Sequence, residues 1–159
     1  MILSEFIYGG MDGVITTAAI IAGIIGANIS TKYALILGLA NLCADGFSMA
    51  ISNYNSLKDL VHEKKSSPLF KACITGLSFV LMGAIPLIPF PFIQMSNEEK
   101  MKYMLIVFSF LSFAIIGAIK GMYTKKYLKS FLEVVLIGSI GVYISFYVAR
   151  ILKIRYIMN

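Results

Sequence analysis

Five long apolar runs dominate the sequence and leave almost no room for a soluble core. Only short polar connections separate these runs, which cover residues 7–29, 34–56, 69–93, 103–122 and 131–152. Each run has the roughly 20 residues that an α-helix needs to cross a bilayer. A soluble domain of 159 residues could not bury five runs of this length. The pattern predicts an all-α integral membrane protein with five transmembrane helices, which form a single transmembrane domain over residues 1–159.

The basic residues lie between the apolar runs and near the C-terminus, not on one face of a helix. The net charge is +6, and this distribution predicts lipid headgroups as partners and no nucleic acid. The connections on the same side as the N-terminus hold eight basic residues, whereas the opposite side holds six. Because basic residues concentrate on the cytoplasmic side, we expect a cytoplasmic N-terminus.

Asp45 is the charged residue that lies deepest in an apolar run. Lys32 and Lys58 each lie 13 positions away, which places Asp45 near the middle of the second helix. A charged carboxylate at that depth costs roughly 2.5–3.5 kcal/mol on insertion scales. We therefore expect Asp45 to face a polar cavity, a partner or a metal ion. The alternative is a structural hydrogen bond to a neighbouring helix.

A polar stripe runs along the same helix as Asp45. Counting by three and four residues gives Asn41, Asp45, Ser48, Met49, Ser52, Asn53 and Ser56. A stripe of this polarity is unsuited to lipid. The Met49 thioether follows Asp45 by one turn, and sulfur beside a carboxylate suits a borderline ion such as Fe²⁺. The alternative for Met49 is core packing, because methionine often fills irregular gaps.

Two further acidic residues lie near the start of the chain. Asp12 precedes Gly13 and an apolar run, so it can be the N-cap of a helix that begins there. Alternatively, a helix that begins near Leu3 would place Asp12 within the bilayer and Glu5 closer to the cytoplasmic interface. In the second case both carboxylates are candidate metal ligands.

Acidic residues also occur next to the later connections. Ser130 and Glu133 have the spacing of a capping box that opens the fifth helix. Between the second and third helices, Asp59, His62 and Glu63 could share one helical face and bind metal weakly. A solvated loop is the alternative for this cluster.

Small residues recur along the first helix with a spacing of about four residues, at Gly9, Gly13, Ala18, Ala22 and Gly26. Such a face lets helices approach closely in lipid. Five helices cannot form two equal inverted halves, which is a common plan of single-chain transporters. We therefore expect a homodimer that forms through the first helix.

Two prolines should break the third helix near its outer end. Pro86 and Pro89 lack the N–H that an α-helix needs, which frees the carbonyls of Met82 and Ile85. A neighbouring helix, water or a passing cation could satisfy these carbonyls.

Four segments, in order, resemble the vacuolar iron transporter family, which includes the plant nodulin-21-like proteins. They are Asp12–Thr17 (DGVITT), Ala44–Ala50 (ADGFSMA), Gly83–Pro89 (GAIPLIP) and Glu133 with Gly138. The resemblance implies a dimer of five-helix subunits that moves Fe²⁺ or Mn²⁺ out of the cytosol in exchange for protons. By this resemblance, Asp12 and Met49 line the pathway near the dimer axis, with Asp45 and Glu133 beside or behind it.

The sequence departs from the family pattern at two places. Many members insert a Glu-rich metal-binding domain between the second and third helices, whereas this chain has only residues 57–67 there. The family usually has Glu where this chain has Asn53. These departures put the capture of cytosolic metal, the selectivity and the proton coupling in question.

Together with the residues, the resemblance leads us to expect a secondary transporter of Fe²⁺ or Mn²⁺, with protons as the second substrate and no permanently bound cofactor. Its membrane would be that of an acidic, vacuole-like organelle in a eukaryote, or the plasma membrane in a prokaryote. An enzyme is not expected, because the single histidine, His62, lies in a connection. The alternative is a non-transporting membrane partner, or a degenerate family member whose polar stripe is structural. The candidate metal ligands are Asp12, Asp45, Met49 and Glu133, followed by Asn53, Glu5, His62 and Glu63.

Overall fold

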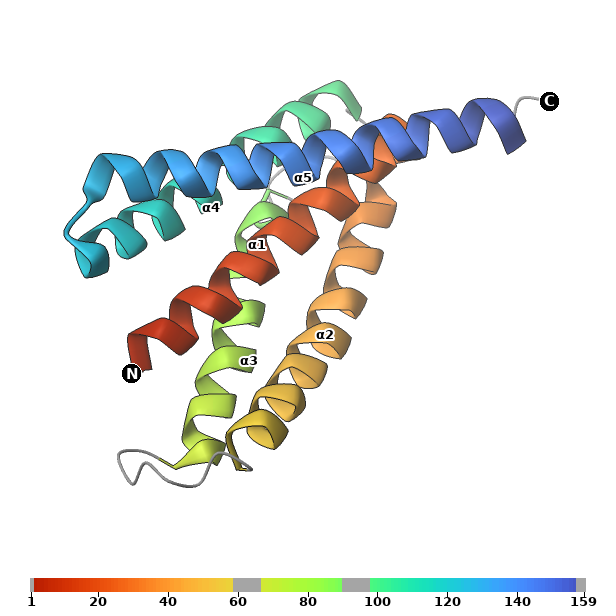
Figure 1. Ribbon diagram of the computed structural model, residues 1–159. Coiled ribbons are helices and arrows are strands. Elements are labelled where there is room, and N and C mark those ends of the chain that lie inside the picture. Colours follow the sequence, from red (N-terminus) through yellow and green to blue (C-terminus); the bar gives the residue numbers. More distant parts are fainter. Residues whose placement is uncertain (1, 59–66, 90–97, 157–159) are drawn as a thin grey trace.

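The protein folds into an assembly of long helices (Figure 1) in a computed structural model that describes residues 2–58, 67–89 and 98–156. The helices are α1 (Ile2–Gly26), α2 (Lys32–Lys58), α3 (Pro68–Ala84), the short 3₁₀ helix η1 (Ile85–Leu87), α4 (Glu98–Thr124) and α5 (Tyr127–Tyr156). Within the described residues, five helices are long and apolar enough to cross a membrane, with η1 counted as part of the third. The predicted all-α, five-helix membrane fold is confirmed.

Four helices extend beyond the predicted apolar runs because their ends are polar. α2 covers Lys32–Lys58 and not 34–56, and α4 covers Glu98–Thr124 and not 103–122. α1 begins at Ile2 and not at residue 7, so Glu5 lies in its first turn. α5 covers Tyr127–Tyr156 and not 131–152, and it ends with Lys153 and Arg155 in its last turn. Long basic side chains at a helix end can reach the headgroup region while their stems stay in the apolar layer. A search for apolar runs therefore places these helix ends too far inward.

The third helix ends earlier than predicted, at the expected proline break. α3 stops at Ala84, and Pro86 lies inside η1. The carbonyl of Met82 accepts the Ile85 N–H, and the carbonyl of Ile85 accepts the Ile88 N–H at 3.1 Å. The segment therefore satisfies its own freed carbonyls. The predicted continuation over residues 90–93 lies outside the described residues.

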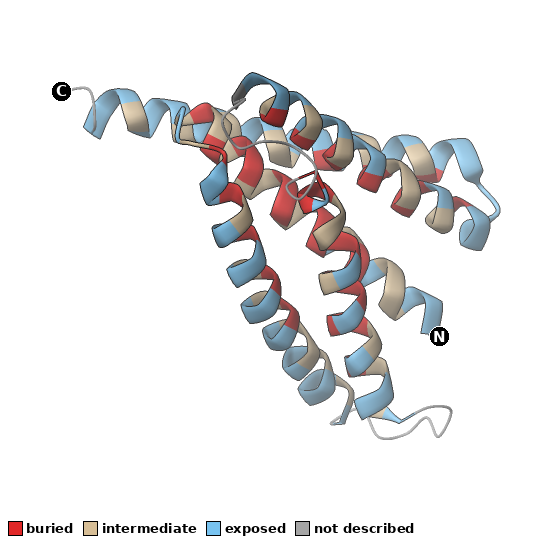
Figure 2. Ribbon diagram, turned by 180° about the vertical axis from the view of Figure 1, so that it is seen from behind, coloured by how far each residue is buried: buried red, intermediate tan, exposed pale blue. Residues whose placement is uncertain are grey.

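α1 is the central helix and contacts all four of the other long helices. Gly9 and Gly13 allow α3 to approach closely, because an added Cβ would meet backbone atoms of Thr75 or Phe79. Gly26 does the same for α5. Buried residues accordingly gather on the inner faces around α1 (Figure 2). The small residues thus serve helix contact within one chain, and the predicted homodimer stays a prediction.

Two apolar clusters hold the helices together. One includes Leu42 and Phe79 and joins α2 and α3 to the second half of α1. The other includes Val14, Phe113 and Val134 and joins α1 to α4 and α5. Large apolar side chains on the outer face of α5 stay exposed, as expected for a surface that contacts lipid. The first half of α1 and the second half of α2 extend beyond the first cluster.

The turn between α1 and α2 reverses the chain. Asn28 adopts a left-handed conformation with φ of 54°, which asparagine tolerates better than most residues. The Ile29 N–H bonds the carbonyl of Ile24 at 3.0 Å and closes the end of α1. Because α2 then runs back along α1, residues near the start of α1 lie level with residues near the end of α2.

Candidate functional site

A polar groove of about 620 Å³ lies between the first half of α1 and the second half of α2. We call it the α1–α2 groove. Its lining residues are Glu5, Tyr8, Asp12, Asp45, Ser48, Met49, Ser52, Asn53 and Ser56. The α2 contribution is the polar stripe that the sequence predicts, apart from Asn41. The groove thus brings that stripe together with the acidic residues of α1.

The carboxylates are arranged at two levels along the groove. Glu5 and Asp12 are seven residues apart on α1, which is two helical turns or about 10.5 Å. Glu5 contacts Asn53, and Asp12 lies close enough to Asp45 for the two carboxylates to interact electrostatically. The outer level therefore holds one carboxylate, and the inner level holds two.

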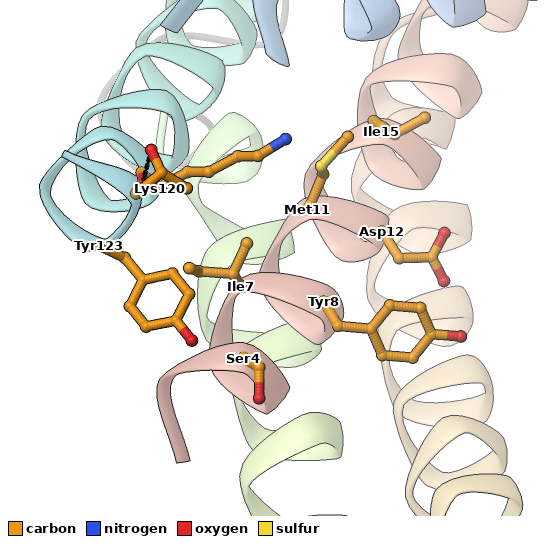
Figure 3. A pocket seen from close by; sticks show the side chains of 9 residues that line it. Ser4, Ile7, Tyr8, Met11, Asp12, Ile15, Lys120 and Tyr123 are labelled. Carbon is orange, nitrogen blue, oxygen red and sulfur yellow. Dashed lines mark hydrogen bonds between the residues drawn. The ribbon is translucent and has the colours of Figure 1, made fainter. Parts of the chain in front are cut away.

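Asp12 lies in the middle of α1, so the alternative that it caps a helix beginning at Gly13 is wrong. Its side chain reaches from α1 toward α2, as does that of Tyr8 (Figure 3). Asp45 lies at the centre of α2 and is half-buried. Within residues 2–58, 67–89 and 98–156, neither aspartate has a hydrogen bond or an ion pair. Both carboxylates are thus available to a ligand.

Met49 combines the two roles that the sequence leaves open. It lines the α1–α2 groove, and it also packs against the cluster that contains Leu42 and Phe79. A half-buried side chain of this kind can support the core and still present its sulfur to the groove.

Glu5 is held by side chains from two other helices. The Asn53 amide of α2 donates to Glu5 Oε2 at 2.9 Å, and the Thr75 hydroxyl of α3 lies 3.3 Å from the same oxygen. Asn53 also donates to Thr75 Oγ1 at 2.6 Å. These three residues connect α1, α2 and α3 at the outer level of the groove.

Glu133 lies on α5 and does not line the groove. It forms an ion pair with Lys120 of α4 at 2.9 Å. The predicted capping box is wrong, because α5 begins at Tyr127 and the Ser130 hydroxyl instead lies 2.7 Å from that of Thr124. The assignment of Glu133 as a metal ligand stays a prediction.

A second cavity, of about 500 Å³, lies on the other side of α1. Lys120 lines it from α4 and Met11 from α1, while Tyr8 and Asp12 line both this cavity and the groove. Figure 3 shows Lys120 reaching toward α1 from the side opposite to the Asp12 carboxylate. Tyr8 and Asp12 therefore occupy the part of α1 that separates the polar groove from the second, mainly apolar cavity.

The predicted cluster of Asp59, His62 and Glu63 lies outside the described residues. Elsewhere in the chain, over the ranges that the structure describes, no three His, Cys, Asp or Glu side chains are close enough to hold one ion together. The groove thus presents its carboxylates at two levels along its length. This arrangement differs from the closed set of ligands that retains a structural metal.

Sequence reasoning missed two residues of the site. Tyr8 lies between Glu5 and Asp12 at helical spacing, so its place on their face could have been inferred from position alone. Thr75 lies in an apolar run, and nothing in the sequence indicates that α3 directs it toward Glu5. Its contact depends on how α3 packs against α1 at Gly9.

The fold and the groove define a multi-pass α-helical membrane protein that keeps carboxylates within its spanning helices. Comparison with known families identifies one to which the chain is similar over most of its length. The VIT family pattern matches residues 3–60 and 57–150, which together cover nearly the whole sequence. The chain belongs to the VIT family, and the resemblance found in the sequence is confirmed.

Individual relatives match the chain over different lengths. The vacuolar iron transporter of Toxoplasma gondii is 44% identical over 62 residues, which make up 37% of this chain and 20% of that protein. The Plasmodium falciparum vacuolar iron transporter is 43% identical over 54 residues, or 34% of this chain and 20% of that protein. The chain thus spans about a fifth of these relatives. Vacuolar iron transporter homolog 4 of Arabidopsis thaliana is 26% identical over 164 residues, which cover 91% of this chain and 80% of the plant protein.

Proposed function

We propose that the protein transports Fe²⁺ or Mn²⁺ through the membrane, with the α1–α2 groove as part of the pathway. The direction is out of the cytosol, into a vacuole-like compartment or out of the cell, in exchange for protons. The names of the relatives support iron as a substrate. The observation that carries the proposal is the series of groove carboxylates, Glu5, Asp12 and Asp45, beside the Met49 thioether.

The groove suits an ion that binds and leaves repeatedly. A hydrated divalent cation would meet Glu5 first and then reach Asp12 and Asp45, where carboxylate oxygens replace part of its water shell. The two inner carboxylates carry like charges, and a divalent cation between them removes their mutual repulsion. Carboxylates must lose protons to bind metal, so protons compete for the same oxygens. An acidic compartment on the far side would therefore favour release.

Reconstitution tests the proposal. Purified protein in liposomes should take up Mn²⁺ and Fe²⁺ with saturation, and the uptake should depend on a pH gradient. Zn²⁺ tests selectivity in the same assay. Asp12→Ala and Asp45→Ala should each abolish uptake, because each removes one of the paired inner carboxylates. Unimpaired uptake by both variants would refute the assignment.

A measurement of metal binding distinguishes the proposed transporter from the alternative, a non-transporting membrane partner. A polar stripe that only docks another helix requires no metal site, so the purified protein would show no saturable binding of Mn²⁺. A transporter with the proposed groove should bind Mn²⁺ and should lose part of that binding in Asp45→Ala.

A further inference from the structure

Asn53 and Thr75 meet at a hydrogen-bonded junction that fixes one carboxylate of the α1–α2 groove. Thr75 is fully buried, and its hydroxyl also lies 3.1 Å from the carbonyl of Lys71 on its own helix. That bond to the preceding turn fixes the position of the hydroxyl. Asn53 directs one amide N–H at Thr75 and the other at Glu5. Its contact with Thr75 therefore fixes the Asn53 amide relative to α3.

Asn53 donates to one oxygen of Glu5, and the Thr75 hydroxyl, whose single proton serves either Glu5 or the Lys71 carbonyl, lies beside the same oxygen. The distances to Oε2 are 2.9 Å from Asn53 Nδ2 and 3.3 Å from Thr75 Oγ1. Glu5 also lines the groove, and within the described residues both contacts go to Oε2, so Oε1 is available to an ion. A glutamate side chain is otherwise free to turn about three bonds, so the junction selects one orientation before an ion arrives.

We propose that Asn53, with help from Thr75, is a positioning residue that holds Glu5 as a preorganised cation ligand at the outer level of the groove. The inference rests on the proposed function, since it concerns how the transported ion is first bound. Asn53 itself acts through Glu5, with its amide N–H groups turned to Glu5 and Thr75. An ion that enters the groove thus meets a carboxylate that is already oriented, about 10.5 Å along α1 from Asp12.

The chemistry of an amide explains why this side chain suits the position. Asparagine offers two N–H donors and carries no charge, so it can satisfy a carboxylate without competing for the ion. A second carboxylate at the same distance from Glu5 would repel it and would have to share a proton or a cation with it. With the amide, no second negative charge lies beside Glu5 at this position.

The test measures Mn²⁺ uptake and Mn²⁺ binding by the purified full chain, for Asn53→Ala, Glu5→Gln and the double variant. Loss of a residue that orients a metal ligand typically weakens metal affinity about 10-fold to 100-fold. We expect Asn53→Ala to raise the KM for Mn²⁺ about 10-fold with little change in maximal rate. Glu5→Gln should raise KM at least as much, and the double variant should equal Glu5→Gln alone.

The matched control is Asn55→Ala, which removes the same amide from an exposed position of α2 that does not line the groove. It should leave KM unchanged. Thr75→Val, which removes the hydroxyl, should raise KM more than Thr75→Ser, which keeps it. The Thr75 pair keeps the inference testable if Asn53→Ala fails to fold.

An unchanged KM in Asn53→Ala, or an effect that persists in the Glu5→Gln background, would overturn the inference. In the second case Asn53 would serve only the packing of α1 against α2. Either outcome would leave the proposed function standing, provided that Asp12→Ala still abolishes uptake. Absence of saturable uptake by the unmodified protein would instead remove the proposed function itself.

Discussion

The ion pair between Lys120 and Glu133 connects the last turns of α4 to the beginning of α5. The two side chains are 21% and 45% exposed, and Lys120 Nζ lies 2.9 Å from Glu133 Oε1. Each charge therefore has a partner of opposite sign in the helical hairpin. The sequence predicts Glu133 as a metal ligand, whereas the geometry gives it a role in pairing two helices. Exchanging the charges of Lys120 and Glu133 distinguishes a role in metal binding from a role in helix pairing.

We expect Lys120→Met and Glu133→Gln each to destabilise the protein by about 0.2–1 kcal/mol, as for other partly exposed ion pairs. The double variant Lys120→Glu/Glu133→Lys should restore both the thermal midpoint in detergent and the Mn²⁺ uptake, because it rebuilds the pair. A restored midpoint without restored uptake would contradict this expectation and would favour Glu133 as a ligand. The thermal midpoint and uptake are measured on the same preparations.

Residues that are costly to bury were the ones that could be predicted from sequence. Asp45 and Asp12 stand out because a carboxylate inside an apolar run needs a polar surrounding, and both line the groove. The polar stripe on α2 followed from helical spacing alone. Thr75 could not be found in this way, since a single hydroxyl in an apolar helix can bond its own backbone and need not mark a site.

At the scale of helices, the contact between α1 and α3 depends on residues without side chains. A Cβ at Gly13 would meet the backbone of Phe79, which cannot move aside as a flexible side chain could. By contrast, a Cβ at Gly141 of α5 would lie 3.4 Å from the Cγ2 atom of Ile15, an ordinary contact. The two glycines therefore form a matched pair for substitution by alanine.

Gly13→Ala should destabilise the protein by about 1–3 kcal/mol, because the added methyl group pushes α1 away from α3. Gly141→Ala should leave stability unchanged or raise it by up to about 1 kcal/mol, since alanine favours a helix more than glycine does. Thermal denaturation in one detergent, followed by circular dichroism, measures both. Equal midpoints for the two variants would show that the α1–α3 contact is looser than the structure has it.

The helix number could be predicted from sequence, but the helix ends could not. Five apolar runs fix five helices because the bilayer requires each span to be about 20 residues long. The ends depend on whether flanking polar residues continue the helix. Glu5 and Lys153 do continue it, and the continuation of α1 is what brings Glu5 into the groove.

At the scale of the whole molecule, the α1–α2 groove of a single chain exposes polar residues that are costly to place against lipid. Asp12, Ser48 and Ser52 are exposed in the isolated chain, and all three line the α1–α2 groove. A carboxylate that faces lipid at mid-membrane costs roughly 2.5–3.5 kcal/mol on insertion scales. A second copy of the chain that covers this face would provide a polar surrounding and enclose the pathway. Apart from the family resemblance, the sequence could suggest a dimer only by elimination, because a self-complementary surface has no distinct pattern.

Tyr8 is the residue that best reports on such a dimer. It is 62% exposed, and it lies on α1 between the groove and the second cavity. If two copies cover each other's grooves about a twofold axis, equivalent positions on this part of α1 approach each other. In a Cys43→Ser/Cys73→Ser background, which removes both native thiols, Tyr8→Cys should form a covalent dimer in membranes under mild oxidation. Leu69→Cys is the control, because Leu69 is 60% exposed on α3 and lies outside the groove. Cross-linking at Leu69 but not at Tyr8 would place the interface elsewhere. That result would contradict a dimer in which the second copy covers the α1–α2 groove.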